Sequence, residues 1–273
     1  MNINIQVLGS TSSGNCTLVW DSESSIMIDC GFSPRYIDRS LSALNMDVAS
    51  LSGVLITHAH TDHIRGPMLK NLFKDQVPVF CHNRIKPVLV QKHQVVKEAE
   101  DQGLLQTFKN KGFKAGSFLV HGFEVPHDSP GGCFGFNIFK YLKSGLKKIT
   151  VATDLGYPED DLIENFIDSD VIVIESNHDC DMLQNSARPG WVKDRIRDIG
   201  HLSNEQCAQF LDKVIAGSVK KPQAVILAHI SQQCNTNCLA QAQTRQALDK
   251  GNHGEVQVLL TRHMEPNEIV TIE

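Results

Sequence analysis

The sequence lacks the features that would place the protein in a membrane or outside the cell. None of its apolar runs approaches the roughly 20 residues that a membrane-spanning helix requires. Its start, MNINIQVLGS, contains neither the basic nor the apolar region of a secretory signal peptide. The eight cysteines include no CxxC pair, whereas disulfide scaffolds are mainly short secreted chains. We therefore expect a cytoplasmic protein with reduced thiols and no membrane partner.

The sequence also lacks an excess of positive charge. Its formal net charge is −5, which argues against nucleic-acid binding through overall charge and leaves room for local basic patches. Hydrophobic residues make up 41% and charged residues 21% of the 273 positions, as in ordinary globular proteins and unlike disordered ones. No repeat, low-complexity segment or flexible linker divides the chain. We expect a single domain over residues 1–273.

Short apolar runs rich in β-branched residues alternate with amphipathic segments along the chain. The runs are bounded by Gly, Pro, Asn or Asp and predict strands. The helix predicted at 204–216 has a capping-box start, with Ser203 as N-cap and Gln206 three residues later. This mixed order of elements is compatible with an α/β fold. Helices are predicted near 34–44, 66–74, 83–99, 158–167, 191–199, 204–216 and 237–250.

Four predicted strands each end at a residue of a type that binds metals. The strand GVLIT runs into His58, FEVP into His127, ITVAT into Asp154 and AVILA into His229. Side chains gathered from strand ends and loops on a rigid scaffold are a common pattern of catalytic sites. These four distant positions therefore predict one site.

The stretch HAHTDH places four residues of metal-binding type within six positions. His58 and His60 point to one side of an extended segment, and Asp62 and His63 follow on the turn into the next helix. This arrangement suits two neighbouring metal ions, and imidazole with carboxylate suits Zn²⁺, Mn²⁺ or Fe²⁺. A lone histidine would more simply be a surface group, but four such residues so close together favour metal binding.

The HxHxDH motif, with a lone His, an Asp and a last His at strand ends, resembles the metallo-β-lactamase fold hydrolases over nearly the whole chain. The resemblance implies a four-layer αββα sandwich with the site at one edge of its two sheets. It also implies that Asp29, in SIMIDCG, is a structural aspartate that orients the metal loop. Seven ligands for two divalent ions are implied: His58, His60 and His127 for one, Asp62, His63 and His229 for the other, and Asp154 as the bridge.

Three further stretches narrow this resemblance. TSSGN (11–15), ESNHD (175–179) and GHLSN (200–204), together with LAHIS (227–231), resemble the bacterial YycJ/WalJ-like branch of DNA exonucleases and, more distantly, ribonuclease Z. Position 154 holds Asp where the commonest true β-lactamases have Cys, which argues against antibiotic hydrolysis. His178 is equally compatible with an ordinary loop histidine. The residues of these stretches that we expect to contact substrate are Ser13, Asn15, His178 and Ser231.

The reaction implied by this resemblance is phosphodiester hydrolysis of nucleic acid, with DNA favoured over RNA. Two divalent ions would lower the pKa of a shared water to roughly 7 and so supply the nucleophile. Asp62 and Asp154 are expected to act in catalysis through the metals. His201 lies just before a helix N-terminus, where it is expected to protonate the leaving oxygen or to bind phosphate. The basic stretches 140–148 and 188–197 would either hold a nucleic-acid backbone or form solvated surface.

Three alternatives remain at this point. A small-molecule hydrolase of the same fold (a thioesterase, lactonase or cyclic phosphodiesterase) would use the same ligands. A redox di-iron protein of this fold usually has Glu in the first motif and an attached flavin domain, whereas this chain has His60 and shows no such domain. A non-catalytic binding module would have a broken ligand set. The sequence leaves the oligomeric state open, with a homodimer as one option.

Overall fold

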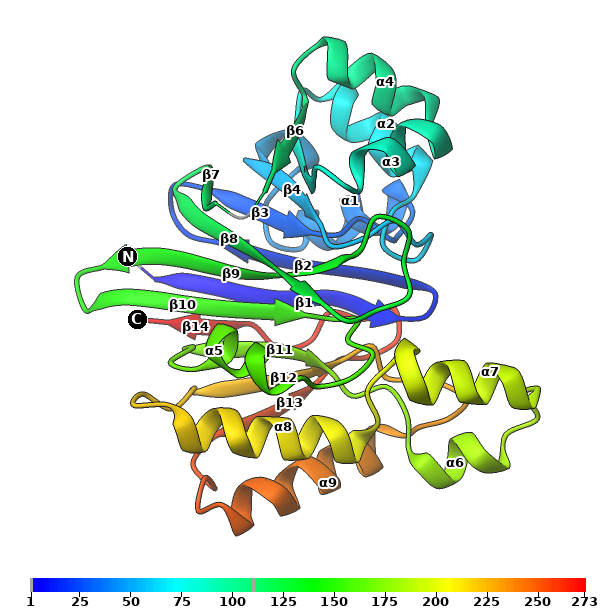
Figure 1. Cartoon of the computed structure of the whole chain (residues 1–273). Coiled ribbons are helices and arrows are strands. Elements are labelled where there is room, and N and C mark those ends of the chain that lie inside the picture. Colours follow the sequence, from blue (N-terminus) through cyan, green and yellow to red (C-terminus); the bar gives the residue numbers. More distant parts are fainter. Residues whose placement is uncertain (1, 110) are drawn as a thin grey trace.

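The computed structural model describes residues 2–109 and 111–273. Two seven-stranded sheets pack face to face, and helices cover the outer side of each sheet (Figure 1). The layers therefore follow the order α, β, β, α, which confirms the expected sandwich. None of the helices in these residues is both long and apolar enough to cross a bilayer.

The first sheet has the strand order β14-β1-β2-β3-β4-β5-β6. From β3 to β6 neighbouring strands are parallel, and the β1–β2 and β2–β3 pairs are antiparallel. Four helices cover this sheet: α1 (Pro34–Ser42), α2 (Gly66–Lys74), α3 (Lys86–Lys92) and α4 (Gln94–Asp101). The strands are β1 (Ile3–Thr11), β2 (Gly14–Trp20), β3 (Ser25–Ile28), β4 (Gly53–Ile56), β5 (Val79–His82), β6 (Leu105–Phe108) and β14 (Val270–Ile272).

The edge strand β14 joins the two ends of the described chain. It pairs antiparallel with β1, with Ile3 opposite Ile272. Asn267, just before β14, reinforces this contact: its side-chain oxygen accepts from the Val7 N–H at 2.7 Å, and its carbonyl accepts from the Gln6 amide at 2.7 Å.

The second sheet has the strand order β13-β12-β11-β10-β9-β8-β7. Helices α5 (Ile163–Phe166), α8 (Asn204–Gly217) and α9 (Asn237–Lys250) cover its outer face, while α6 (Cys180–Asn185) and α7 (Gly190–Arg195) stand beyond one end of it (Figure 1). The strands are β7 (Phe113–Ala115), β8 (Phe118–Val125), β9 (Cys133–Leu142), β10 (Gly145–Ala152), β11 (Val171–Glu175), β12 (Ala224–Ala228) and β13 (Gln257–Leu260).

Strand β11 shows why the central runs are apolar at every position. Val171 and Val173 lie in the core between the two sheets, while Ile172 and Ile174 lie in the core between the second sheet and its helices. Successive side chains of a strand point to opposite faces, and both faces are covered here. A run without polar positions is therefore what this layer requires.

The predicted helix at 83–99 is wrong in one respect, because the structure divides it into α3 and α4. His93 between them has an extended backbone with φ −134° and ψ 105°. Its ring lies close to α2, where a Cβ added at Gly66 would be 3.2 Å from the His93 Nδ1. Helix α6 was not predicted at all. The capping box is confirmed: the Gln206 N–H donates to Ser203 Oγ at 3.1 Å, and the Ser203 N–H donates to Gln206 Oε1 at 2.9 Å.

Candidate metal centre

One edge of the second sheet collects the residues that follow four of its strands. β10, β11 and β12 are parallel neighbours, and β8 has the same direction because both β8 and β10 are antiparallel to β9. Their carboxyl ends therefore meet. His127, Asp154 and His229 follow β8, β10 and β12, and Glu175 is the last residue of β11.

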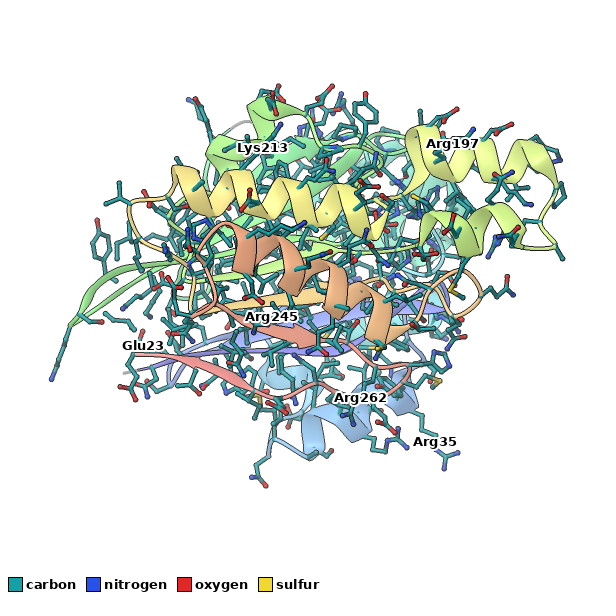
Figure 2. The ribbon with its side chains drawn as sticks, turned by 90° about the horizontal axis from the view of Figure 1, so that it is seen from below. Glu23, Arg35, Arg197, Lys213, Arg245 and Arg262 are labelled. Atoms are coloured by element: carbon teal, nitrogen blue, oxygen red, sulfur yellow. The ribbon has the colours of Figure 1, made fainter. Side chains whose placement is uncertain are left out.

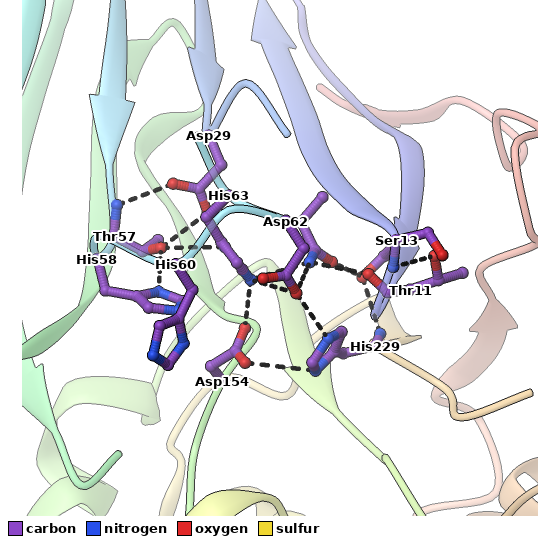
Figure 3. Close-up of polar contacts among 12 residues, drawn as sticks. Thr11, Ser13, Asp29, Thr57, His58, His60, Asp62, His63, Asp154 and His229 are labelled. Carbon is purple, nitrogen blue, oxygen red and sulfur yellow. Dashed lines mark hydrogen bonds and ion pairs between the residues drawn. The ribbon is translucent and has the colours of Figure 1, made fainter. Parts of the chain in front are cut away.

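The loop after β4 brings the HAHTDH stretch to the same edge, and Asp29 fastens it at both ends (Figure 3). The Asp29 carboxylate accepts hydrogen bonds from the Thr57 N–H at 2.9 Å, from the Thr57 hydroxyl at 2.8 Å and from His63 Nδ1 at 2.6 Å. Asp29 takes the rare left-handed conformation, with φ 62°, directly after β3. Two residues later only glycine fits, because a Cβ at Gly31 would lie 1.7 Å from the Asp62 carbonyl oxygen.

Three histidines form the first ligand group. His58 Nε2 lies 3.0 Å from His60 Nδ1, which lies 3.3 Å from His127 Nε2. All three nitrogens fall within 4.8 Å of one another. The motif supplies two of them from one extended segment, and the second sheet supplies the third.

An aspartate and two histidines form the second group. Asp62 Oδ2 lies 3.6 Å from His63 Nε2 and 3.6 Å from His229 Nε2. Asp154 stands between the two groups, with Oδ2 2.8 Å from His63 Nε2 and Oδ1 3.7 Å from His127 Nε2. The structure thus brings together all seven residues of the predicted ligand set. Figure 3 shows six of them: His58, His60, Asp62, His63, Asp154 and His229.

In four of these histidines, the ring nitrogen turned away from the centre meets a hydrogen-bond acceptor. Such a partner fixes the tautomer, so the remaining nitrogen presents its lone pair to the centre. In each case the fixed nitrogen is Nδ1 and the free one is Nε2. The acceptors are the Thr57 hydroxyl for His58 (3.0 Å), Asp29 for His63 (2.6 Å), the Gly200 carbonyl for His127 (2.7 Å) and Glu175 for His229 (2.6 Å).

The polar atoms that face the centre are short of hydrogen-bond partners. Asp154 Oδ2 and His229 Nε2 are buried and have no such partner among the described residues. Because His63 Nδ1 donates to Asp29, a neutral His63 presents only a lone pair to the Asp154 oxygen 2.8 Å away. A proton or a cation must lie between two such acceptors, since an unpaired buried polar group costs about 1–3 kcal/mol. Nitrogen and carboxylate donors in this arrangement fit a divalent transition metal.

Burial keeps the first group ready to bind a metal. It lowers the pKa of His58 well below the ordinary value, and it lowers the pKa of His127 as well. Burial and the neighbouring His127 lower the pKa of His60 to about 4. These rings are therefore neutral near pH 7, which is the state that coordinates metals.

In the second group the pKa values of the histidines are raised rather than lowered. Burial opposes the charged form of His63, but Asp154 and Asp29 outweigh it and raise the pKa of His63 well above its ordinary value. The same balance of burial against Asp154 raises the pKa of His229. A metal that binds this group therefore competes with protons.

Zinc binding to the metal-free protein is accordingly expected to release protons. A raised pKa means that His63 and His229 hold protons below that pKa, so zinc affinity should rise with pH until the raised pKa is passed and level off only above it. Calorimetric titrations in two buffers of different ionisation enthalpy measure the number of protons released. Identical heats in both buffers, together with an affinity independent of pH, would contradict this expectation.

Glu175 is the functional residue that the sequence analysis missed. It is fully buried, and its Oε1 accepts from His201 Nδ1 at 2.8 Å and from His229 Nδ1 at 2.6 Å. Its Oε2 accepts from the N–H groups of Leu155 at 2.9 Å and Leu202 at 3.2 Å. Burial opposes ionisation, but the two histidines outweigh it and lower the pKa of Glu175, so it is a carboxylate. A charged residue at the end of the apolar run DVIVIE was the available signal.

A cavity of about 290 Å³ opens beside the two groups. His201 lines it with its side chain 24% exposed, so this ring is accessible while its Nδ1 is held by Glu175. Residues of the predicted ligand set that line the cavity are His60, Asp62, His127, Asp154 and His229.

The four residues expected to contact substrate take different places. Ser231 lines the cavity, and Ser13 is exposed at the turn between β1 and β2. Asn15 is buried behind the second group, with its amide nitrogen 2.9 Å from His63 Nε2. His178 is buried, and its Nδ1 has no partner among the described residues. Substrate contact by these four residues stays a prediction.

The chain matches one protein family and two groups of relatives over most of its length. Residues 24–230 match the family described as the Beta-lactamase superfamily domain. The chain is 29% identical over 256 residues to exodeoxyribonuclease YycJ of Bacillus anthracis, covering 93% of this chain and 92% of that protein. It is 28% identical over 236 residues to exodeoxyribonuclease WalJ of Streptococcus pneumoniae, covering 86% of this chain and 84% of that protein.

Solved structures share the fold at much lower identity. The metallo-β-lactamase fold protein YhfI from Bacillus subtilis superposes with a TM-score of 0.69 at 14% identity, covering 99% of this chain and 100% of that one. The long form of RNase Z from yeast gives a TM-score of 0.64 at 14% identity, covering 98% of this chain and 41% of that one. With the sandwich, the ligand groups and these matches together, the chain belongs to the β-lactamase superfamily and is a metal-dependent hydrolase of the metallo-β-lactamase fold.

Proposed function

We propose that this protein is a phosphodiesterase that degrades nucleic acid from an end, with DNA as the favoured substrate. The observation that carries the proposal is His201, whose ring is oriented by Glu175 and lines the same cavity as the ligand groups. The relatives named exodeoxyribonucleases support DNA, and they match most of this chain.

We assign the seven ligand-type residues to two divalent ions, zinc or manganese, with iron as a third option. When bound, such ions supply Lewis-acid charge and an activated water at neutral pH. The chain's own part is to hold the ligand atoms in place through the hydrogen bonds behind them. His58, His60 and His127 would hold one ion, Asp62, His63 and His229 would hold the other, and Asp154 would contribute to both.

His201 is assigned the transfer of a proton to the departing oxygen of the diester. Because its Nδ1 faces Glu175, its Nε2 is the nitrogen left for the cavity. A ring held in this way can transfer a proton at Nε2 to an oxygen bound in the cavity. The capped start of α8 lies two residues away at Ser203, and the positive end of that helix dipole favours phosphate nearby.

The experiment that tests this function compares classes of substrate under one set of conditions. Protein loaded with Zn²⁺, Mn²⁺ or Mg²⁺ is incubated with end-labelled single- and double-stranded DNA, with RNA, with bis-p-nitrophenyl phosphate, and with a thioester and a lactone. We expect cleavage of DNA that starts at an end and releases short products. The Asp154→Ala protein, purified in parallel, shows whether a contaminating nuclease is responsible.

Other outcomes point to other functions. Faster turnover of RNA than of DNA would keep the mechanism and change the substrate. Brisk hydrolysis of the thioester or lactone, with no diester cleaved under any metal, would overturn the proposal and favour a small-molecule hydrolase of the same fold.

A further inference from the structure

A helical hairpin, residues 180–200, borders the metal cavity on one side. It consists of α6, α7 and a π-helical segment Ile196–Gly200 that continues α7, and it stands clear of the second sheet (Figure 1). Residues spaced three or four apart on a helix share a face. The hairpin residues that line the cavity are Val192, Arg195 and Ile196, at this spacing, and Arg188, two residues before α7.

The Arg188 guanidinium makes one side-chain hydrogen bond through Nη2, whereas its Nε makes none to the residues that the structure describes. Its Nη2 donates to Gln233 Oε1 at 3.0 Å, in the loop that also carries His229. Its Nε is buried and has no hydrogen-bond partner within residues 2–109 and 111–273. Arg188 as a whole lines the cavity, and a guanidinium at that place matches a phosphate or carboxylate oxygen of a bound substrate.

The neighbouring arginines of the hairpin are already neutralised. Arg195 Nε donates to Asp128 Oδ2 at 2.8 Å, which ties α7 to the loop after β8. Arg197, labelled in Figure 2, pairs with Asp194 at 2.6 Å and with Asp198 at 3.1 Å, both next to it on the same hairpin. Arg188 is in no ion pair among the described residues, so its charge is available to a ligand.

Trp191 stands on the same hairpin, and its side chain is largely exposed at 70%. It lies on α7 four positions before Arg195 and directly before Val192, both of which line the cavity, and three positions after Arg188. Its indole is thus on the surface of the hairpin that borders the cavity rather than in the core. An exposed aromatic face beside a free cation is the combination that binds single-stranded nucleic acid, since bases stack on the ring while the cation holds the backbone.

We propose that Arg188 and Trp191 form a binding site for single-stranded nucleic acid. Arg188 binds a phosphate next to the one being cleaved, and Trp191 stacks on a base outside the cavity. A duplex hides its base faces, so the site selects an unpaired end. The identity of the polymer rests on the proposed function, whereas the binding contacts are measured without cleavage.

Tryptophan fluorescence tests the stacking contact directly, because the chain contains two tryptophans. The Trp20→Phe variant leaves Trp191 as the reporter and changes a partly buried residue of β2, far from the hairpin along the chain. It is titrated with oligothymidylate and with an abasic oligomer of equal length, both carrying phosphorothioate linkages that resist hydrolysis. We expect oligothymidylate to quench the emission and the abasic oligomer to leave it unchanged.

Matched variants separate the two contacts. Trp191→Ala should weaken binding of oligothymidylate by roughly tenfold or more while having little effect on the abasic oligomer. Arg188→Ala should weaken binding of both. Arg197→Ala removes an equal charge from the same hairpin and serves as the control that keeps wild-type affinity.

The results also distinguish this inference from the proposed function. Equal oligothymidylate affinity in Trp191→Ala and wild type, or equal affinity in Arg188→Ala and Arg197→Ala, would overturn the binding site even if DNA is cleaved. Oligothymidylate binding that depends on Trp191 and Arg188, without cleavage of any nucleic acid, would support the site and refute the nuclease function.

Discussion

The Asp154→Ala variant is expected to lose hydrolysis by at least about 10³-fold and to bind less metal. Asp154 approaches both ligand groups, with oxygens 2.8 Å from His63 Nε2 and 3.7 Å from His127 Nε2. Lewis-acid stabilisation is worth several kcal/mol, and each 1.36 kcal/mol is a factor of ten in rate. Elemental analysis of the purified proteins and initial rates on bis-p-nitrophenyl phosphate measure both effects.

A control for this experiment lies at the opposite end of the neighbouring strand. Asp170 precedes β11 and is also buried, and its carboxylate accepts from the Lys148 N–H at 2.8 Å and pairs with Lys220. Asp170→Ala should cost stability in thermal unfolding but keep the metal content. Unchanged metal in Asp154→Ala would refute its assignment as the shared ligand.

The His201→Ala variant is expected to keep its metal and lose roughly 10²–10⁴-fold in rate on DNA. The loss should shrink for a diester with a p-nitrophenolate leaving group, which departs without protonation. The comparison of the two substrates therefore reports proton donation rather than folding or metal loss. Equal losses on both would make His201 a phosphate-binding residue, and no loss on either would leave it as a histidine before a helix.

The Glu175→Gln variant tests whether Glu175 positions His201. Glu175 Oε1 holds both His201 and the ligand-type residue His229. We expect this variant to lower the rate and also to weaken metal binding, because partners of metal-binding histidines typically contribute 10–100-fold in affinity or activity. Metal affinity equal to that of His201→Ala would show that Glu175 acts on His201 alone.

The resemblance to the metallo-β-lactamase fold hydrolases implied the sandwich, and the ends of the predicted strands indicated that ligand-type residues converge. Both conclusions rest on short stretches of sequence. A motif such as HAHTDH is read within six positions, and each of the other three residues follows a recognisable apolar strand. The structure shows that these strand ends share an edge, as the resemblance implied. Which residue binds which ion stays a proposal.

The remaining parts of the site depend on which strands and loops become neighbours. Glu175 matters because β11 lies between β10 and β12, which places it beside His201 and His229. The Arg188 side chain is oriented by a hydrogen bond to Gln233, 45 positions away in the sequence. Helix α3 ends at His93, whose ring lies beside Gly66 of α2, and no glycine or proline marks this end in the sequence. None of these relations is written in a short stretch of sequence.

The pairing of β14 with β1 sets an order of events during synthesis. β1 leaves the ribosome long before residues 270–272 exist, so one of its edges offers unpaired N–H and C=O groups to other chains in the meantime. All seven ligand-type residues precede residue 230, which means that the site can assemble in a nascent chain whose first sheet is still open. The step that covers the long edge of β1 can therefore follow the one that assembles the site, and it depends on the three residues of β14, a much shorter edge strand.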